Sequence, residues 1–492
     1  MRRKGKDRRS RRLHSRAVRW TTLVRFLDLF RPVSRFIPEV RAPQRKVSFN
    51  TRLMWTLGAL AIYLVMSEIP LYGVTTDGSD PYATLRIIFA SNRGTLMELG
   101  IGPIVTAGLI IQLLAGSDII SFDRSSPEDR GLFTTASKVF SFIMVIVQAS
   151  LYIVSGVYGT ITRTQSVLIF GQLLAAGMII MMLDEMVQKG WGIGSGISLF
   201  IVAGITQNIW WMSLSFSGPM GDGRSYGALV AFVQGILGGL PPLDWLYRSG
   251  WPDMIGFLMT LAVFAFVVYV EGMRVEIPIS HSSYRGYRSR MPIKLLYVSN
   301  IPVILAYSMF ANFQLIGQFI WSRWNTENTN FFLNMFGMFN KTSSGNVNAI
   351  GGLAYYTTSP GSLSGVAADP VRAILYLLIV VGFCVLFSIT WLEIGGLGAD
   401  QMAEQLLQSG MQVAGFRRSK KPLERLLNRY IPTITIIGGI IVGLLASLSE
   451  FFGVFGSGMG ALLAVSILYQ YYQTMVQEQV EDLYPFLRGA FG

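Results

Sequence analysis

The residues that could perform catalysis or bind a metal ion are few and widely separated in this 492-residue chain. Its two histidines, His14 and His281, lie in a basic tail and in a loop, so no histidine cluster exists for metal binding or acid–base work. The single cysteine, Cys384, lies in an apolar run, which excludes an intrachain disulfide and indicates a small buried hydrophobic residue. The glycine-rich run 192–196 lacks the Lys-Ser/Thr of a phosphate-binding loop. The sequence therefore predicts no catalytic residue, no metal site and no cofactor.

Acidic residues inside a membrane would indicate ion coupling, because charge is costly there and marks functional positions. The acidic residues of the apolar segments instead fall near segment ends, where we expect water or lipid headgroups to reach them. These residues are Glu68, Asp184, Glu185, Glu271, Glu393 and Glu450. The pattern argues against a proton-coupled pump and favours a pore with an apolar constriction.

Composition predicts a polytopic helical membrane protein. Hydrophobic residues make up 51% of the chain, charged residues only 14%, and the mean hydropathy is +0.45. Apolar runs repeatedly reach the roughly 20 residues that a helix needs to cross about 30 Å of hydrocarbon. Ten spans are predicted, at 52–72, 96–117, 135–158, 164–187, 194–211, 253–272, 293–321, 372–394 and two within 431–477, split near 450–460.

The distribution of basic residues predicts the orientation of these spans. Residues 1–52 hold 17 of the 41 Lys and Arg, and placing this tail in the cytosol puts 33 of the 41 on the cytosolic side. Both chain ends are therefore predicted to be cytosolic. The tail is not typical of a secretory signal; we interpret it as a cytosolic retention signal that contacts anionic lipid or ribosomal RNA. Residues 20–30 are predicted to form an amphipathic helix on the membrane surface.

Five spans on each side of Pro241-Pro242 suggest two halves of opposite topology, as in inverted-repeat transport folds. Glycine and proline interrupt spans in both halves, and such breaks are tolerated mainly where a segment lines protein or water. The expected units are a cytosolic tail with an amphipathic helix at 1–48, a first half at 49–240, a second half at 241–477 with cytosolic loops at 274–292 and 395–430, and a cytosolic C-terminal tail at 478–492.

Three stretches, Leu96–Leu114, Asp184–Phe200 and Met291–Pro302, resemble motifs of the SecY family in order and spacing. They are most similar to the archaeal form and to the alpha subunit of the eukaryotic translocon, and the resemblance spans about residues 47–486. The basic first 20 residues do not match the family. The resemblance implies an all-α membrane protein with ten transmembrane helices in two inverted pseudo-symmetric five-helix halves, and a SecY-like channel with a re-entrant plug helix.

The resemblance also implies an hourglass pore, closed at its waist by aliphatic side chains and from outside by a plug at 81–93. Flexible aliphatic side chains fit around any extended polypeptide, and a dewetted constriction resists ions. For each ring residue alone, ordinary packing is the alternative; for the plug, it is an ordinary external helix. The ring is Ile101, Val105, Ile197, Ile201, Ile304 and Leu463, and the plug is Ala83, Thr84, Leu85, Arg86, Ile87, Ile88, Phe89, Ala90, Ser91, Asn92 and Arg93.

Three smaller groups of residues match further positions of the family. The alternative for the first group is plain interhelical hydrogen bonding, and for the second it is positive-inside charge alone. The groups are Thr106, Gln148 and Asn312 at a lateral gate, Arg285, Gly286 and Arg417 at the ribosome contact, and Arg86, Arg93 and Glu393 in signal orientation.

The function implied by the resemblance is passage of unfolded polypeptides across a membrane and release of spans into the bilayer. It is not an enzyme, so the energy must come from the ribosome or another motor. Expected partners are SecE- or gamma-type and beta-type small subunits, the ribosome with its RNA, signal sequences, nascent polypeptides and membrane lipid. The plasma membrane is the expected location, with the endoplasmic reticulum as the alternative. A small-solute transporter of inverted-repeat type is the rival class, whereas an intramembrane enzyme lacks a nucleophile and a base.

Overall fold

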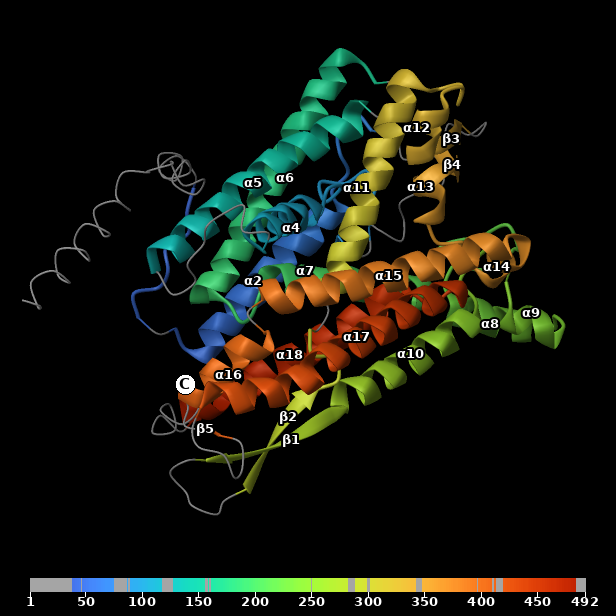
Figure 1. Cartoon of the computed structure of the whole chain (residues 1–492). Helices are drawn as coiled ribbons and strands as arrows, with labels where there is room; N and C mark the ends of the chain where they lie inside the picture. The colour runs from blue at the N-terminus through green and yellow to red at the C-terminus, as the bar shows by residue number, and fades with distance from the viewer. Residues whose placement is uncertain are drawn as a thin grey trace, which may run out of the picture.

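Long helices packed side by side dominate the computed structural model of the chain (Figure 1). The structure describes residues 38–45, 47–74, 86, 89–116, 127–154, 158, 161–248, 250–281, 288–298, 301–341, 347–395, 397–408, 411–412 and 419–483. The long helices are α2 (Phe49–Glu68), α4 (Gly102–Gly116), α5 (Pro127–Val154), α6 (Arg163–Met186), α7 (Gly196–Leu214), α10 (Met254–Gly272), α11 (Ile301–Trp324), α15 (Pro370–Ile394), α17 (Lys420–Phe451) and α18 (Gly458–Leu483).

Each of the ten predicted segments overlaps one of these helices. Within the described ranges, eight of them are long and apolar enough to cross a membrane. The other two are α4, which is short for a span, and α18, whose second half carries several polar residues. Because no water is available inside a bilayer, an α-helix that satisfies its own backbone hydrogen bonds is the natural form of such segments.

Two predicted spans begin too early. The second was expected from residue 96, but α4 begins at Gly102, and residues 96–101 form turns that bond to neighbouring loops. The seventh was expected from residue 293, but α11 begins at Ile301, and residues 293–294 end a strand. In both places the glycine or proline that was taken to interrupt a span instead marks the start of its helix.

The strands were not predicted from the sequence. β1 (Arg274–His281) pairs antiparallel with β2 (Arg288–Lys294), and β5 (Met411–Gln412) adds to the other edge of β1. Ile277 and Ile293 of this hairpin are buried in a second hydrophobic core with residues of α15, α16 and α17. A separate pair, β3 (Met338–Lys341) and β4 (Val347–Gly351), lies in the connection after α11. The strands are small additions to the predicted all-helical bundle.

Short helices fill the connections between the long ones. η3 continues from the end of α6, α8 and α9 join α7 to α10, and the next three lie between α11 and α15 (Figure 1). They are η3 (Val187–Trp191), α8 (Ala228–Leu237), α9 (Pro242–Leu246), α12 (Phe331–Phe336), α13 (Gly352–Tyr356), α14 (Leu363–Ala368) and α16 (Ala399–Gln408).

α17 packs unusually close to α15, because glycine stands where the two helices meet. A Cβ atom built on Gly443 would lie 2.8 Å from the Cα atom of Val381. One built on Gly439 would lie 2.9 Å from the hydroxyl oxygen of Ser388. Small residues at a contact of this kind let two helix backbones approach each other, which is a common basis of helix packing in membranes.

The six acidic residues lie at helix ends, as predicted, but the expectation that water reaches them is wrong for four. Asp184, Glu185, Glu271 and Glu450 are 5–8% exposed. A buried carboxylate is costly unless it is paired or hydrogen-bonded, and each of the four has partners. Asp184 accepts hydrogen bonds from Gln188 and the backbone of Ile197, Glu185 pairs with Lys138 and Lys189, Glu271 lies 3.9 Å from Lys294, and Glu450 accepts from Tyr376.

Candidate functional site

The loop between α2 and α4 is closed at its neck by backbone hydrogen bonds. The amide of Leu71 donates to the carbonyl of Gly94 at 2.8 Å, and the amide of Leu96 donates to the carbonyl of Ile69 at 2.9 Å. The chain therefore leaves the end of α2 and returns to the same place before α4 begins. The predicted plug lies within this closed loop.

The end of the predicted plug is bound to the helices around it. The amide of Ile101, just before α4, donates to the carbonyl of Phe89 at 2.8 Å. The hydroxyl of Tyr63 in α2 donates to the carbonyl of Ala90 at 3.2 Å. Arg86 and residues 89–93 are described here; Ala83, Thr84, Leu85, Ile87 and Ile88 lie outside the described residues.

Two residues at this contact have left-handed backbones. Ala90 has φ of 51° and Gly100 has φ of 52°. A left-handed conformation costs a residue with a Cβ roughly 1–2 kcal/mol, whereas glycine adopts it freely. A Cβ on Gly100 would also overlap the carbonyl oxygen of Phe89. Glycine is therefore required at position 100 for this close approach, and the strain at Ala90 is held by its surroundings.

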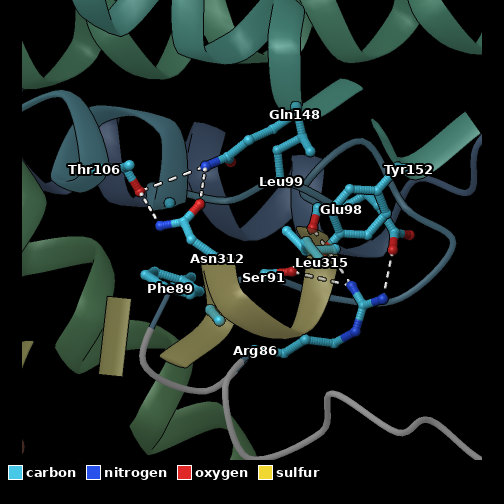
Figure 2. Close-up of a pocket in the computed structure, with 12 residues that line it drawn as sticks. Arg86, Phe89, Ser91, Glu98, Leu99, Thr106, Gln148, Tyr152, Asn312 and Leu315 are labelled. Carbon is cyan, nitrogen blue, oxygen red and sulfur yellow. Dashed lines mark hydrogen bonds and ion pairs between the residues drawn. The ribbon is translucent and has the colours of Figure 1, made fainter. Parts of the chain in front are cut away.

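A buried ion pair joins the predicted plug to the chain just before α4 (Figure 2). The guanidinium of Arg86 lies 2.5 Å from the carboxylate of Glu98, with side-chain exposures of 6% and 0%. Arg86 also donates to the hydroxyl of Ser91 at 3.2 Å and lies 5.9 Å from the ring centre of Tyr152 in α5. Glu98 additionally accepts from the amide of Gly94.

Sequence reasoning missed Glu98 and Tyr152; it named Ser91 only as a plug residue, without this pairing. A carboxylate inside a predicted apolar span is a usable signal, because such a group must find a partner. Glu98 lies in the predicted second span, and its partner Arg86 was already a candidate site residue. The pairing itself depends on the fold of the loop, which the sequence pattern does not define.

All six predicted ring residues lie in one contiguous hydrophobic core. They come from the start of α4, from α7, α11 and α18, so both halves of the chain contribute. Ile101, Ile201 and Leu463 are 0–1% exposed, and the other three are partly buried and pack against the same core. The other three are Val105, Ile197 and Ile304.

The three predicted gate residues form one hydrogen-bonded cluster across α4, α5 and α11 (Figure 2). The amide of Asn312 donates to the hydroxyl of Thr106 at 3.2 Å. The amide of Gln148 donates to Thr106 at 3.4 Å and to the amide oxygen of Asn312 at 3.5 Å. These distances are long, so each bond is weak. We call this cluster the polar seam.

A small cavity separates the polar seam from the Arg86–Glu98 pair. Its volume is about 20 Å³, enough for about one water molecule. Residues from the plug, α4, α5 and α11 line it, including Phe89, Tyr152 and Leu315 (Figure 2). The plug and the polar seam are therefore nearly in contact, with little free space between them.

The remaining candidate residues are dispersed. Arg93 is partly buried at the neck of the plug loop, and Glu393 is exposed in the last turn of α15. The predicted ribosome contacts Arg285, Gly286 and Arg417 lie outside the described residues. The same holds for the predicted amphipathic helix at 20–30.

A bundle of long apolar helices with an apolar centre, a loop folded back onto that centre and a polar seam fits a polytopic membrane channel. The SecY family model matches residues 95–472, and the model for the plug domain of Sec61p matches residues 62–94. The chain belongs to the SecY family, whose members form protein-conducting channels, and it is the pore-forming subunit type.

Solved structures agree with this assignment. One described as a protein-conducting channel is 39% identical, has a TM-score of 0.79, and covers 93% of this chain and 99% of its own. A SecY structure, described as showing that the plug domain stabilises the closed state and maintains a membrane seal, is 39% identical with a TM-score of 0.76 and the same coverage. Canine Sec61 in a ribosome–channel complex from the endoplasmic reticulum is 37% identical, also with that coverage, and has a TM-score of 0.77.

Proposed function

We propose that this chain passes unfolded polypeptides through a constriction made by Ile101, Val105, Ile197, Ile201, Ile304 and Leu463. The observation that carries the proposal is their shared burial: six aliphatic side chains from four segments, far apart in sequence, lie in one core. Aliphatic side chains offer no fixed hydrogen-bond partner, so they can close on one another or surround a chain of any sequence. No step of this function needs a catalytic group in this subunit.

Residues 83–93 are proposed as the plug that seals the constriction in the resting state. The bond from Ile101 to the carbonyl of Phe89 supports this role, because Ile101 is itself a proposed ring residue. The Arg86–Glu98 pair supports it further, since a buried pair of this kind favours one position of the loop. The SecY relative with a plug domain that stabilises its closed state is consistent with this reading.

The polar seam of Thr106, Gln148 and Asn312 is proposed as the lateral gate through which hydrophobic segments leave to lipid. Hydrogen bonds between membrane helices contribute on average about 0.6 kcal/mol each. A seam held by three long hydrogen bonds therefore parts at lower cost than a closely packed apolar contact. Arg86, Arg93 and Glu393 are proposed to influence the orientation of the segment that enters the gate, by attracting or repelling its flanking charges.

Nascent-chain crosslinking tests the pore. Ribosomes would be stalled on a secretory precursor that carries one cysteine, in membranes containing Ile201→Cys, Ile304→Cys or Leu168→Cys variants of this chain. Leu168 on α6 is 46% exposed on the outside of the bundle and serves as the matched control. Crosslinks from positions 201 and 304, and none from 168, are expected. Equal crosslinking at all three, or none despite a bound ribosome, would overturn the proposed constriction.

Small SecE- or gamma-type and beta-type subunits and the ribosome are proposed as partners. The canine relative in a ribosome–channel complex supports the ribosome. Arg285, Gly286 and Arg417 are proposed contacts, because arginine suits the phosphates of ribosomal RNA. Reversing both charges (Arg285→Glu with Arg417→Glu) should abolish cosedimentation with ribosomes, whereas Arg372→Glu outside the cytosolic loops should not.

The membrane in which the chain resides and the division of the chain into structural units are also proposals. Motifs closest to the archaeal form support the plasma membrane, and the canine relative from the endoplasmic reticulum supports the alternative. Fractionation of cells expressing the tagged chain would decide between them. The proposed units remain a tail at 1–48, halves at 49–240 and 241–477 with cytosolic loops at 274–292 and 395–430, and a tail at 478–492. α4 and α11 both begin later than the apolar runs that lead into them, which supports a similar design of the halves.

A further inference from the structure

The short helix α12 presents its apolar side outwards, although it lies in a connection beyond the end of a spanning helix. Phe331, Phe332, Met335 and Phe336 are 74%, 76%, 61% and 51% exposed. At about 100° per residue these four positions form one continuous helix face. The two remaining residues, at 333 and 334, face the protein and are partly buried. An amphipathic helix on a water-exposed surface normally turns its apolar side to the protein and its polar side to water; α12 does the reverse.

Asparagine side chains hold α12 rigidly against the end of α11. The amide of Asn325, which is 3% exposed, donates to Asn334 of α12 at 2.7 Å. Asn334 in turn donates to the carbonyl of Asn328 at 2.8 Å. Asn330 caps the first turn by accepting from the amide of Phe332. The polar side of α12 is thus hydrogen-bonded within the protein, and its apolar side faces outwards.

The length of α11 brings α12 to the level of the lipid headgroups. Its 24 residues extend for roughly 36 Å at about 1.5 Å per residue. The hydrocarbon layer is about 30 Å thick, and the bilayer with headgroups about 40–45 Å. A helix of this length that crosses the hydrocarbon along the bilayer normal, starting at one edge of it, ends inside the headgroup layer. α12, β3 and β4 lie beside that end (Figure 1).

The end of α11 beside α12 also carries exposed apolar side chains. Ile316 is 43% exposed and Trp324 is 65% exposed, and residues eight apart lie on the same side of a helix. Trp324 packs edge-on against Phe319 at 5.6 Å between ring centres. Arg323, also exposed, adds a positive charge suited to lipid phosphate. Aromatic residues with a neighbouring basic residue are typical of the membrane–water interface.

We propose that α12 is an interfacial anchor, whose face of Phe331, Phe332, Met335 and Phe336 inserts into the outer leaflet between headgroups and acyl chains. The occupant of this face is lipid, because the face lies beside exposed apolar side chains at the end of a spanning helix, at headgroup depth. Since α12 is bonded to the end of α11, the anchor sets the height and rotation of that helix in the bilayer. α11 also carries Ile304 and Asn312, so lipid contact at α12 acts on the same helix as the proposed constriction and gate.

Fluorescence quenching at single cysteines tests the anchor. Phe332→Cys and Met335→Cys of the full-length chain would be labelled with an environment-sensitive fluorophore, and Glu327→Cys, exposed in the same connection, is the matched control. Cys384 is fully buried and should not react; the unmodified chain checks this. The protein would be reconstituted into phosphatidylcholine–phosphatidylglycerol vesicles with iodide on both sides, or with lipids that carry a nitroxide near the headgroup.

The expected result is quenching by iodide several-fold weaker at positions 332 and 335 than at 327, and quenching by the nitroxide lipid several-fold stronger. Equal behaviour at the three positions would overturn the proposal. So would protection that appears only at high protein-to-lipid ratios with energy transfer between labelled copies, which would indicate a second copy of the chain. Exposure to iodide in vesicles but protection in native membranes would indicate a protein partner instead.

Discussion

Replacing Glu98 with glutamine should unseat the plug. The substitution keeps the shape of the side chain but removes the negative charge that lies 2.5 Å from the guanidinium of Arg86. Arg86, 5% exposed, would then keep its buried positive charge but lose the opposite charge of Glu98. The cluster forms only when the end of the plug is folded back against the start of α4, so the cost falls on the seated position of the plug.

The size of the effect follows from the burial of the pair. Removing one partner of a buried ion pair typically costs about 3–5 kcal/mol, because the other charge stays desolvated. With about 1.4 kcal/mol per factor of ten, the ratio of seated to unseated plugs should fall on the order of a hundredfold to a few thousandfold. Replacing both residues with methionine removes both charges and should restore much of the seating, because apolar replacements of a buried pair are often neutral.

Single-channel recording in planar bilayers measures this effect as leak. We expect Glu98→Gln to conduct ions at rest far more often than the parent chain, and the double methionine variant to conduct much less. Glu68→Gln is the control, since Glu68 is an exposed acid at the end of α2. A quiet Glu98→Gln channel, present in the bilayer at normal amount, would refute the reasoning, and so would a double variant that leaks as much as the single one.

Three further predictions concern single positions. Asn312→Leu should change the hydrophobicity that a signal needs to enter the membrane, because it removes two of the three bonds of the polar seam; insertion of reporters of graded hydrophobicity measures it, and identical thresholds would exclude a gate role. Gly100→Ala should also produce a resting leak, costing at least roughly 1–2 kcal/mol of backbone strain, whereas Gly108→Ala, which opens onto free space, should be silent in the same recordings. Partial burial raises the pKa of Asp222, but the hydrogen bonds and charges of Arg248 and Arg224 together outweigh this and lower the pKa to about 2, below its ordinary 3.8. The stabilisation by this pair is therefore complete above about pH 4 and lost as pH falls toward 2, so the melting temperature in detergent should lose part of its acid dependence in Asp222→Asn; superimposable pH curves for the two proteins would contradict this.

The sequence predicted the helices well, because a span must be both long and apolar. The break between α17 and α18 lies near residues 450–460, as predicted. α7 begins at Gly196, within two residues of the predicted start of the fifth span. The starts of α4 and α11 were misplaced, since apolar residues that lead into a span look the same whether they are helical or pack as turns and strands. The hairpin of β1 and β2 was missed because its residues were assigned to a basic loop.

The candidate site was predicted by resemblance rather than by residue chemistry. Thr106, Gln148 and Asn312 are unremarkable polar residues in the sequence, and only the fold brings them within hydrogen-bonding distance. Their role as a gate stays a prediction, as do the roles of the ring and the plug. Glu98 could have been found from its placement in an apolar run, but its partner Arg86 lies 12 positions away in a loop whose path the sequence does not determine.

The glycines of α17 make the bundle unequal in stiffness. At Gly439 and Gly443 the backbones of α15 and α17 touch, so these helices cannot part or tilt without opening a void between them. α11 meets α4 and α5 partly through the long hydrogen bonds of the polar seam, which yield at small cost. Under the proposed gate role, strain from a segment inserted into the centre would be relieved at the seam, always in the same direction. Such a channel would sort polypeptide segments by how strongly each prefers lipid to the channel interior, and it would not need to recognise any particular sequence.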